Sequence, residues 1–123
     1  MGGGVIAGLV AASSGAAYLS PMAALVLGLA AGAIAAFVAG SLRRIDDPAH
    51  LFAIHGVGGA IGALLLPPLT MPLFGGAGFA DGRGIAAHMI AQAVAIAVVA
   101  VWTAIVAFVI LRFCTVVLRR ARA

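Results

Sequence analysis

The amino-acid sequence predicts an all-α protein, a polytopic transmembrane helix bundle with three full spans and a shorter one at the N-terminus. Two observations carry this prediction. Of the 123 residues, 65% are apolar and 8% are charged, whereas soluble domains have about 45–50% and about 25%. The apolar residues also form four long runs, separated by short segments rich in Pro, Gly, Asp or Arg. A run of about 20 apolar residues is long enough to cross a bilayer.

The first two runs lie on either side of a Ser-Pro pair. Residues 2–19 form a glycine-rich apolar run at the lower limit of what crosses a hydrocarbon core of about 30 Å. Ser20 and Pro21 end that run, and residues 22–42 follow without interruption. We expect a short helix in the first run and a full span in the second.

Two further spans follow a polar turn that begins at Arg43. The third run, residues 49–66, should end at Pro67-Pro68, because prolines lack the N–H that a helix interior needs. Residues 70–83 contain the stretch GGAGFADG, which is typical of turns. The last run, residues 84–111, is followed by a tail that contains four arginines.

The polar turn predicts how the third helix begins. Asp47 precedes Pro48, which is the pattern of a helix N-cap followed by proline at the first helical position. We therefore expect Asp46, Asp47 and Pro48 to fix the start of the helix that carries His55.

The arginines predict the orientation of the chain in the membrane. All the basic side chains are arginine, and with three spans six of them share one face while Arg83 lies alone on the other. Cytoplasmic loops carry the excess of basic residues. We therefore expect a multi-pass cell-membrane protein with a cytoplasmic C-terminus. The six are Arg43, Arg44, Arg112, Arg119, Arg120 and Arg122.

Small residues recur every four positions on three of the runs. In lipid, such stripes let helix backbones approach closely, which is how helices associate without a hydrophobic driving force. Glycine and alanine are frequent in any membrane helix, but three stripes in one short chain favour tight packing. The stripes are Gly4, Gly8, Ala12 and Ala16; Gly28, Gly32, Ala36 and Gly40; and Gly58 with Gly62 and Gly59 with Ala63.

The stretch FAIHGVGGAIGALL, residues 52–65, places a histidine in an apolar run. We expect His55 to lie about 9–10 Å into the third span, near mid-membrane depth, on a face with Leu51 one turn earlier and Gly58 and Gly59 one turn later. An ionisable group at that depth is costly unless it faces protein or water, so a neutral imidazole is expected. Neutral imidazole both donates and accepts hydrogen bonds, which suits a proton relay or a narrow conduit.

Other readings of the histidines stay open. His55 could instead join two helices through a hydrogen bond, in a small membrane scaffold without transport activity. A haem anchor ranks third, because His50 and His88 are expected near opposite membrane edges and no pair of histidines matches in depth.

Several function classes are disfavoured by the residues present. The acids Asp46, Asp47 and Asp81 lie in loops, and the two serines at 13 and 14 lack a neighbouring base, so we expect no catalytic residues and no enzyme. The single cysteine, Cys114, excludes a zinc site built on several thiolates, and we expect no metal or other cofactor. The arginines do not form one basic face, so we expect no nucleic-acid partner.

The stretch IDDPAHLFAIHGVGGAIGALL, residues 45–65, resembles the tenth transmembrane segment of the ammonium transporter family, the Amt, Mep and Rh proteins. In that segment an Asp-Asp-Pro turn leads into Phe-x-x-His-Gly-x-x-Gly. Residues 75–82 resemble the following extracytoplasmic loop, residues 88–110 the eleventh and last helix, and residues 2–21 the eighth helix with the loop after it. The resemblance covers essentially the whole chain.

The resemblance implies a trimer of eleven-helix protomers, each with a narrow apolar pore that deprotonates ammonium and conducts ammonia. It aligns His55 with the second of two pore histidines, and Leu51 with an apolar position lining the lumen.

The partner histidine belongs to an earlier helix of the family. His50 stands where the family usually has an acid, and Ser13-Ser14 where Thr-Pro is common. We therefore expect residues 1–123 to be a C-terminal fragment of an ammonium transporter domain, unable to transport alone. Its expected partners are ammonium or ammonia and membrane lipid.

Overall fold

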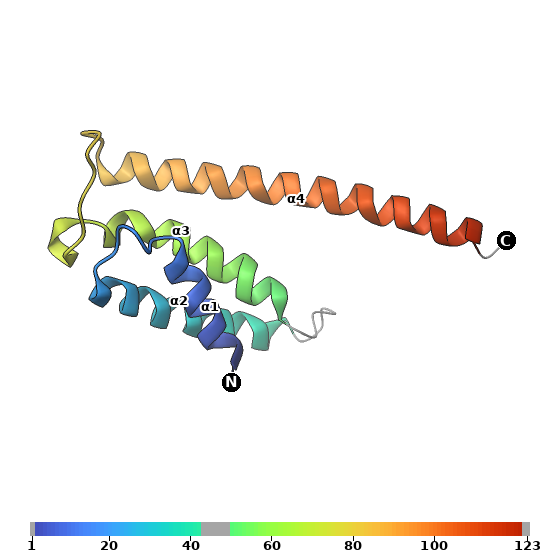
Figure 1. Cartoon of the computed structure of the whole chain (residues 1–123), viewed down its shortest axis with the longest axis horizontal. Helices are drawn as coiled ribbons and strands as arrows, with labels where there is room; N and C mark the ends of the chain where they lie inside the picture. The colour runs from blue at the N-terminus through green and yellow to red at the C-terminus, as the bar shows by residue number, and fades with distance from the viewer. Residues whose placement is uncertain (1, 43–49, 122–123) are drawn as a thin grey trace. The chain divides into compact units, whose positions relative to one another are not determined.

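The structure is a computed structural model that describes residues 2–42 and 50–121 (Figure 1). These residues form α1 (Gly2–Ser13), α2 (Pro21–Ser41), the π-helix η1 (Phe52–Val57), α3 (Gly58–Leu69), the 3-10 helix η2 (Pro72–Phe74) and α4 (Ile85–Ala121), and none of them lies in a β-strand. Within the described ranges, three helical segments are long and apolar enough to cross a membrane, namely Pro21–Ser41, Phe52–Leu69 and Ile85–Leu118, and α1 is a shorter apolar helix. The predicted helix bundle is confirmed.

The chain divides into two compact units, Met1–Gln92 and Ala93–Ala123. The first unit contains α1, α2, η1, α3, the loop after α3 and the first two turns of α4. The second unit consists of the remainder of α4.

The first helix ends earlier than its apolar run. The hydroxyl of Ser13 donates to the carbonyl of Val10 and that of Ser14 to the carbonyl of Ala11, each at 2.7 Å. Serine hydroxyls that bond to backbone carbonyls compete with the regular helix ladder. Turns follow directly, and α1 is a helix of 12 residues rather than one that reaches residue 19.

The second helix begins as expected, at a proline that follows a serine cap. Ser20 is extended, with φ −66° and ψ 156°, and its hydroxyl oxygen accepts a hydrogen bond from the N–H of Ala23 at 3.2 Å. Pro21 occupies the first turn, where its missing N–H would have no helical partner. The Ser20 hydroxyl also donates to the carbonyl of Phe74 at 2.7 Å, which ties the start of α2 to the loop after α3.

The prediction that Pro67-Pro68 ends the third helix is wrong by three residues. Both prolines lie inside α3, which continues to Leu69. Near a helix end the two missing N–H groups leave few carbonyls unpaired, and the fixed φ of proline is compatible with the helix. Thr70 closes the end, because its N–H donates to the carbonyl of Leu66 at 3.0 Å and its hydroxyl to that of Pro67 at 3.0 Å.

The last helix is longer than predicted. It begins at Ile85, close to the expected residue 84, but continues ten residues beyond the expected 111 to Ala121. The extension contains neither glycine nor proline, so its local sequence offers no stop signal.

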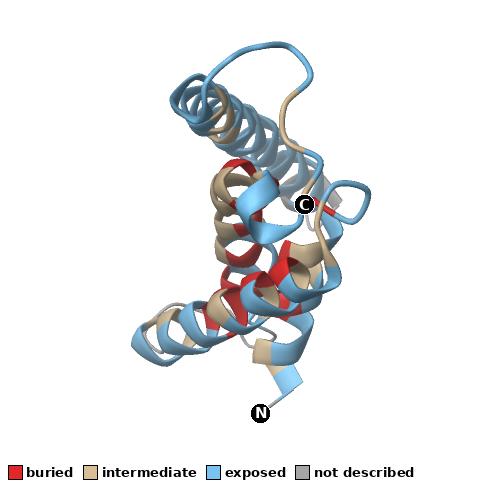
Figure 2. Cartoon of the chain, turned by 90° about the vertical axis from the view of Figure 1, so that its left-hand side faces the viewer, coloured by how far each residue is buried: buried red, intermediate tan, exposed pale blue. Residues whose placement is uncertain are grey.

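The core lies where α1, α2 and α3 face one another, as the buried residues in Figure 2 show. Leu27 is the one large side chain buried almost completely among the described residues. Most other core side chains are alanines, grouped around Leu27 and Leu69 or around Ile54. The three helices therefore pack through small residues, as the stripes predicted.

Glycines make the closest contacts in this core. A Cβ built on Gly8 would lie 2.5 Å from the carbonyl oxygen of Gly28, and one built on Gly62 would lie 2.6 Å from that of Ala11. Such distances exclude a side chain, so the backbones touch directly. The predicted stripes are not packed throughout, because Gly40 and Gly59 face open space.

Candidate functional site

The π-helix η1 carries His55. The N–H of Gly58 donates to the carbonyl of Ala53, five residues earlier, and also to that of His55. Immediately before the helix, His50 has a φ of 52°, in the left-handed region. A right-handed helix does not continue through such a residue, so the described helix starts after His50, at Leu51.

The two faces of η1 differ in burial. Ala53 is 1% exposed and Ile54 is 7% exposed, with Ile54 packed into the cluster that contains Ala7 of α1 and Ala35 of α2. Leu51 is 57% exposed, and His55 is also exposed. Among the described residues, none forms a hydrogen bond with the His55 imidazole. The face with Leu51 and His55 is therefore the one that α1 and α2 leave uncovered.

The structure places His55 early in its helical segment. His55 lies four residues after Leu51, where the described helix begins, and in the first quarter of the segment Phe52–Leu69. Its depth in the membrane stays a prediction.

The expected surroundings of His55 also change in one respect. Gly58, predicted to share its face, is buried, and a Cβ there would lie 3.1 Å from the carbonyl oxygen of Ala7. Gly59 is the glycine that faces open space. Gly58 follows the buried Ile54 by four residues, which places both on the packed side of the helix.

The residues predicted to start this helix, Asp46, Asp47 and Pro48, lie outside the described residues, so their role stays a prediction. His50 borders an open cavity of about 240 Å³ between α1, α2 and η1. The rest of its lining is small or apolar: Gly3, Gly4, Ala35, Ala36, Ala39, Gly40 and Ile54. His50 is the one residue of this lining that has a polar side chain.

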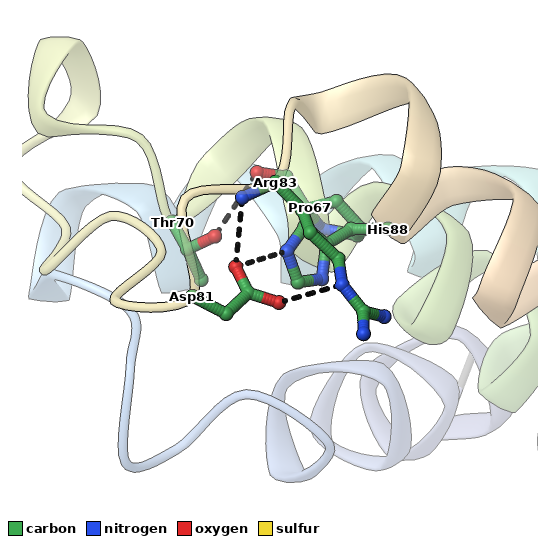
Figure 3. A network of polar contacts seen from close by, with 5 residues as sticks. All are labelled: Pro67, Thr70, Asp81, Arg83 and His88. Atoms are coloured by element: carbon green, nitrogen blue, oxygen red, sulfur yellow. Dashed lines mark hydrogen bonds and ion pairs between the residues drawn. The ribbon is translucent and has the colours of Figure 1, made fainter.

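A second polar cluster lies at the start of α4 (Figure 3). His88 Nε2 is 3.1 Å from Asp81 Oδ1, and the His88 ring stacks on that of Phe79 with centroids 3.8 Å apart and an interplanar angle of 13°. Asp81 Oδ1 also accepts a hydrogen bond from the backbone N–H of Arg83 at 3.2 Å, and Asp81 Oδ2 lies 3.5 Å from Arg83 Nε. The cluster fastens the loop after α3 to the first turn of α4.

The surroundings of Asp81 favour its charged form. The hydrogen bond from the Arg83 N–H is the main cause that lowers the pKa of Asp81 below its ordinary value of 3.8, and the hydrogen bond and charge of His88 act in the same direction. Partial desolvation opposes them. Asp81 is therefore a carboxylate at neutral pH, and it accepts hydrogen bonds only.

Sequence reasoning missed this cluster, since it treated Asp81, Arg83 and His88 separately, as a loop acid, an orientation marker and an interfacial histidine. An aspartate in a glycine-rich loop is typical of an Asx-turn, in which its carboxylate accepts from the backbone N–H two residues later. A histidine in the first turn of the following helix is then within reach of the same carboxylate. Within the residues that the structure describes, no three His, Cys, Asp or Glu side chains come together as metal ligands.

Comparison with known proteins gives a consistent result. The model of the Ammonium Transporter Family matches residues 1–121. The chain is 36% identical over 114 residues to the ammonium transporter of Bacillus subtilis, covering 89% of this chain and 28% of that protein. It is 38% identical over 104 residues to ammonium transporter Amt2 of Haloferax mediterranei, covering 81% of this chain and 22% of that protein.

Ammonium transporter Amt2 of Methanocaldococcus jannaschii is 40% identical to this chain over 77 residues, which cover 61% of this chain and 18% of that protein. The chain thus spans about a fifth to a quarter of the length of these relatives. Because the family model covers nearly all of the sequence, and the structure has the apolar helices expected of such a segment, the chain belongs to the ammonium transporter family.

Proposed function

We propose that this chain forms part of the conduction path of an ammonium transporter, with His55 and Leu51 lining the path. One observation carries the proposal. The His55 imidazole lies on the uncovered face of η1, without a hydrogen-bond partner among the described residues, while Ala53 and Ile54 hold the opposite face against α1 and α2. An ionisable side chain in a membrane helix is expected to face protein or water rather than lipid.

The chemistry of this face suits a small polar molecule that can lose its charge. A neutral imidazole accepts a hydrogen bond at one ring nitrogen and donates one at the other, so it can pass ammonia along an otherwise apolar path. Leu51 supplies the apolar wall beside it and disfavours ions. The names of the relatives, all ammonium transporters, support ammonium or ammonia as the substrate.

We further propose that residues 1–123 correspond to the C-terminal portion of such a transporter and do not transport alone. Three spans and a short helix are too few to enclose a path, and the chain covers only 18–28% of these relatives. The assembly proposed is a homotrimer in the cell membrane, contacting lipid. Six of the seven arginines lie on the side that we assign to the cytoplasm, together with the C-terminus.

A chimera tests the role of His55. The segment of the Bacillus subtilis ammonium transporter that this chain matches is replaced by this chain, and methylammonium uptake is measured in cells that lack their own ammonium transporters. We expect His55→Ala to lower uptake about tenfold, because one hydrogen bond in the path is lost. His50→Asn is the matched control, since asparagine tolerates the left-handed φ of 52° at that position, and it should leave uptake unchanged.

The chimera must reach the membrane in equal amounts for each variant, as measured by immunoblotting of membrane fractions. Equal uptake by the His55→Ala and parent chimeras would contradict the proposal. Expression of the 123-residue chain alone, in the same cells, should give no uptake above background, and uptake by that chain would refute its inability to transport alone.

The close packing of α1, α2 and α3 favours a second candidate, a membrane scaffold without transport activity. Glycine contacts such as Gly8 with Gly28 would then be the whole function of the chain. The two candidates differ in what His55→Ala does. If the chain is only a scaffold, His55→Ala lowers stability or assembly with little effect on uptake. If His55 lines the path, His55→Ala lowers uptake while the variant remains folded.

A further inference from the structure

The helix α4 is longer than a bilayer requires. Its 37 residues extend about 55 Å at 1.5 Å per residue, against about 30 Å for the hydrocarbon core and about 40–45 Å with the headgroup layers. The uncharged stretch between Arg83 and Arg112 alone accounts for about 42 Å. A helix that crosses the membrane along this stretch therefore brings Arg112 to the headgroup layer.

The side chain of Arg112 packs along its own helix. The Cζ atom of its guanidinium lies 5.4 Å from the centroid of the Phe108 ring, one turn earlier on α4. Long basic side chains that keep their stems on apolar surface and extend the charged group toward water are typical of the membrane interface. The Thr115 hydroxyl donates to the Arg112 carbonyl at 2.8 Å, so the polar groups of this turn are satisfied locally.

The charged residues at and after the carboxyl end of α4 are all arginines. Three more arginines follow Arg112 in the sequence, and no acidic residue occurs after Asp81. At the other end, Arg83 lies 3.5 Å from a carboxylate oxygen of Asp81, which compensates its charge. Basic clusters that directly follow a membrane helix are attracted to anionic lipid headgroups. The three following residues are Arg119, Arg120 and Arg122.

We propose that the carboxyl end of α4 binds the headgroups of anionic phospholipids in the leaflet from which it emerges, with Arg112 as the residue nearest the acyl chains. Lipid is favoured over a protein or nucleic-acid partner because the uncharged stretch before Arg112 is as long as a bilayer with its headgroup layers. Each arginine near an anionic surface strengthens such binding by about fivefold at low salt. The proposal does not depend on transport through the His55 face.

The single cysteine provides a probe at this site. Cys114 is exposed and lies two residues after Arg112, so a fluorophore attached to it reports the lipids around this turn. The whole chain is reconstituted in phosphatidylcholine vesicles that contain spin-labelled phosphatidylglycerol or, at the same mole fraction, spin-labelled phosphatidylcholine. The ratio of quenching by the two labelled lipids measures the local enrichment of the anionic lipid.

We expect several-fold enrichment of phosphatidylglycerol, falling at high salt because the interaction is electrostatic. Arg112→Gln should lower the enrichment by up to about fivefold. Arg83→Gln is the matched control, since it removes the arginine that precedes the amino end of α4, and it should leave the enrichment unchanged. Circular dichroism of each variant in vesicles verifies that α4 still forms.

Three outcomes would overturn the proposal. They are equal quenching by the two lipids, enrichment that high salt does not reduce, and equal effects of Arg112→Gln and Arg83→Gln. If Arg112→Gln alters the circular dichroism, a second variant is used in which the three following arginines are replaced by glutamine and Arg112 is kept. That variant should also lose most of the enrichment, and undiminished enrichment would refute a role for the arginines.

Discussion

Replacing Gly8 with alanine tests whether the contact between α1 and α2 depends on a missing side chain. The new Cβ would lie 2.5 Å from the carbonyl oxygen of Gly28, whereas ordinary contact begins near 3.4 Å. The two backbones must therefore separate locally by about 0.9 Å, and overpacking of this kind costs about 1–3 kcal/mol. Gly28→Ala is the matched control at the same crossing, because its Cβ would lie at an ordinary 3.6 Å from the Gly8 carbonyl oxygen.

Both substitutions gain similar helix propensity, about 0.8–1 kcal/mol relative to glycine, so their difference isolates the steric cost. We expect Gly8→Ala to be less stable than Gly28→Ala by about 1–3 kcal/mol. The free energy of unfolding is measured by titrating the micelle-bound chain with SDS and following near-UV circular dichroism. Equal stability of the two variants would refute a direct backbone contact at this crossing.

Three further predictions concern the loop and the other helix contacts. Gly62→Ala should destabilise the chain by about 1–3 kcal/mol in the same titration, since its Cβ would lie 2.6 Å from the Ala11 carbonyl oxygen, whereas Gly59→Ala should not, since that position is open. Ser20→Ala should cost about 1 kcal/mol, because it removes the N-cap of α2. The Arg83 N–H lowers the pKa of Asp81, so the stabilisation that the Asp81 carboxylate provides is present above pH 3.8, its ordinary pKa. That stabilisation is lost as the pH falls through the lowered pKa. The chemical shift of the Arg83 amide in NMR spectra should change with pH through that acidic transition, and this change should be absent in Asp81→Asn.

The sequence predicted the features that follow from composition and local chemistry. The start of α2 at Pro21 follows from a serine cap before proline, and close helix packing through small residues follows from the stripes. Both depend on residues close to one another in the sequence or on a regular spacing. Such features can be predicted without knowing how the helices cross.

The failures have a common physical origin in the backbone between regular elements. The left-handed φ of His50 precedes the described helix, which begins at Leu51 and continues as a π-helix, and a period of 3.6 residues cannot reveal either feature. The cluster around Asp81 was missed because it depends on a turn that brings a loop carboxylate to His88, seven residues later. Pro67 inside α3 shows that the position of a proline in a helix matters as much as its presence.

The spacing of the packed residues explains how one short segment can satisfy two demands. Gly58 must face α1, because a Cβ there would lie 3.1 Å from the Ala7 carbonyl oxygen, and Ile54 must reach the cluster of Ala7 and Ala35. In a regular α-helix Ile54 and Gly58 share a face, and His55 and Gly59 lie one residue further round. Ile54 and Gly58 therefore keep their contacts on one face while His55 stays exposed on the next. We therefore expect glycine at 58 to matter for the orientation of His55 as well as for packing.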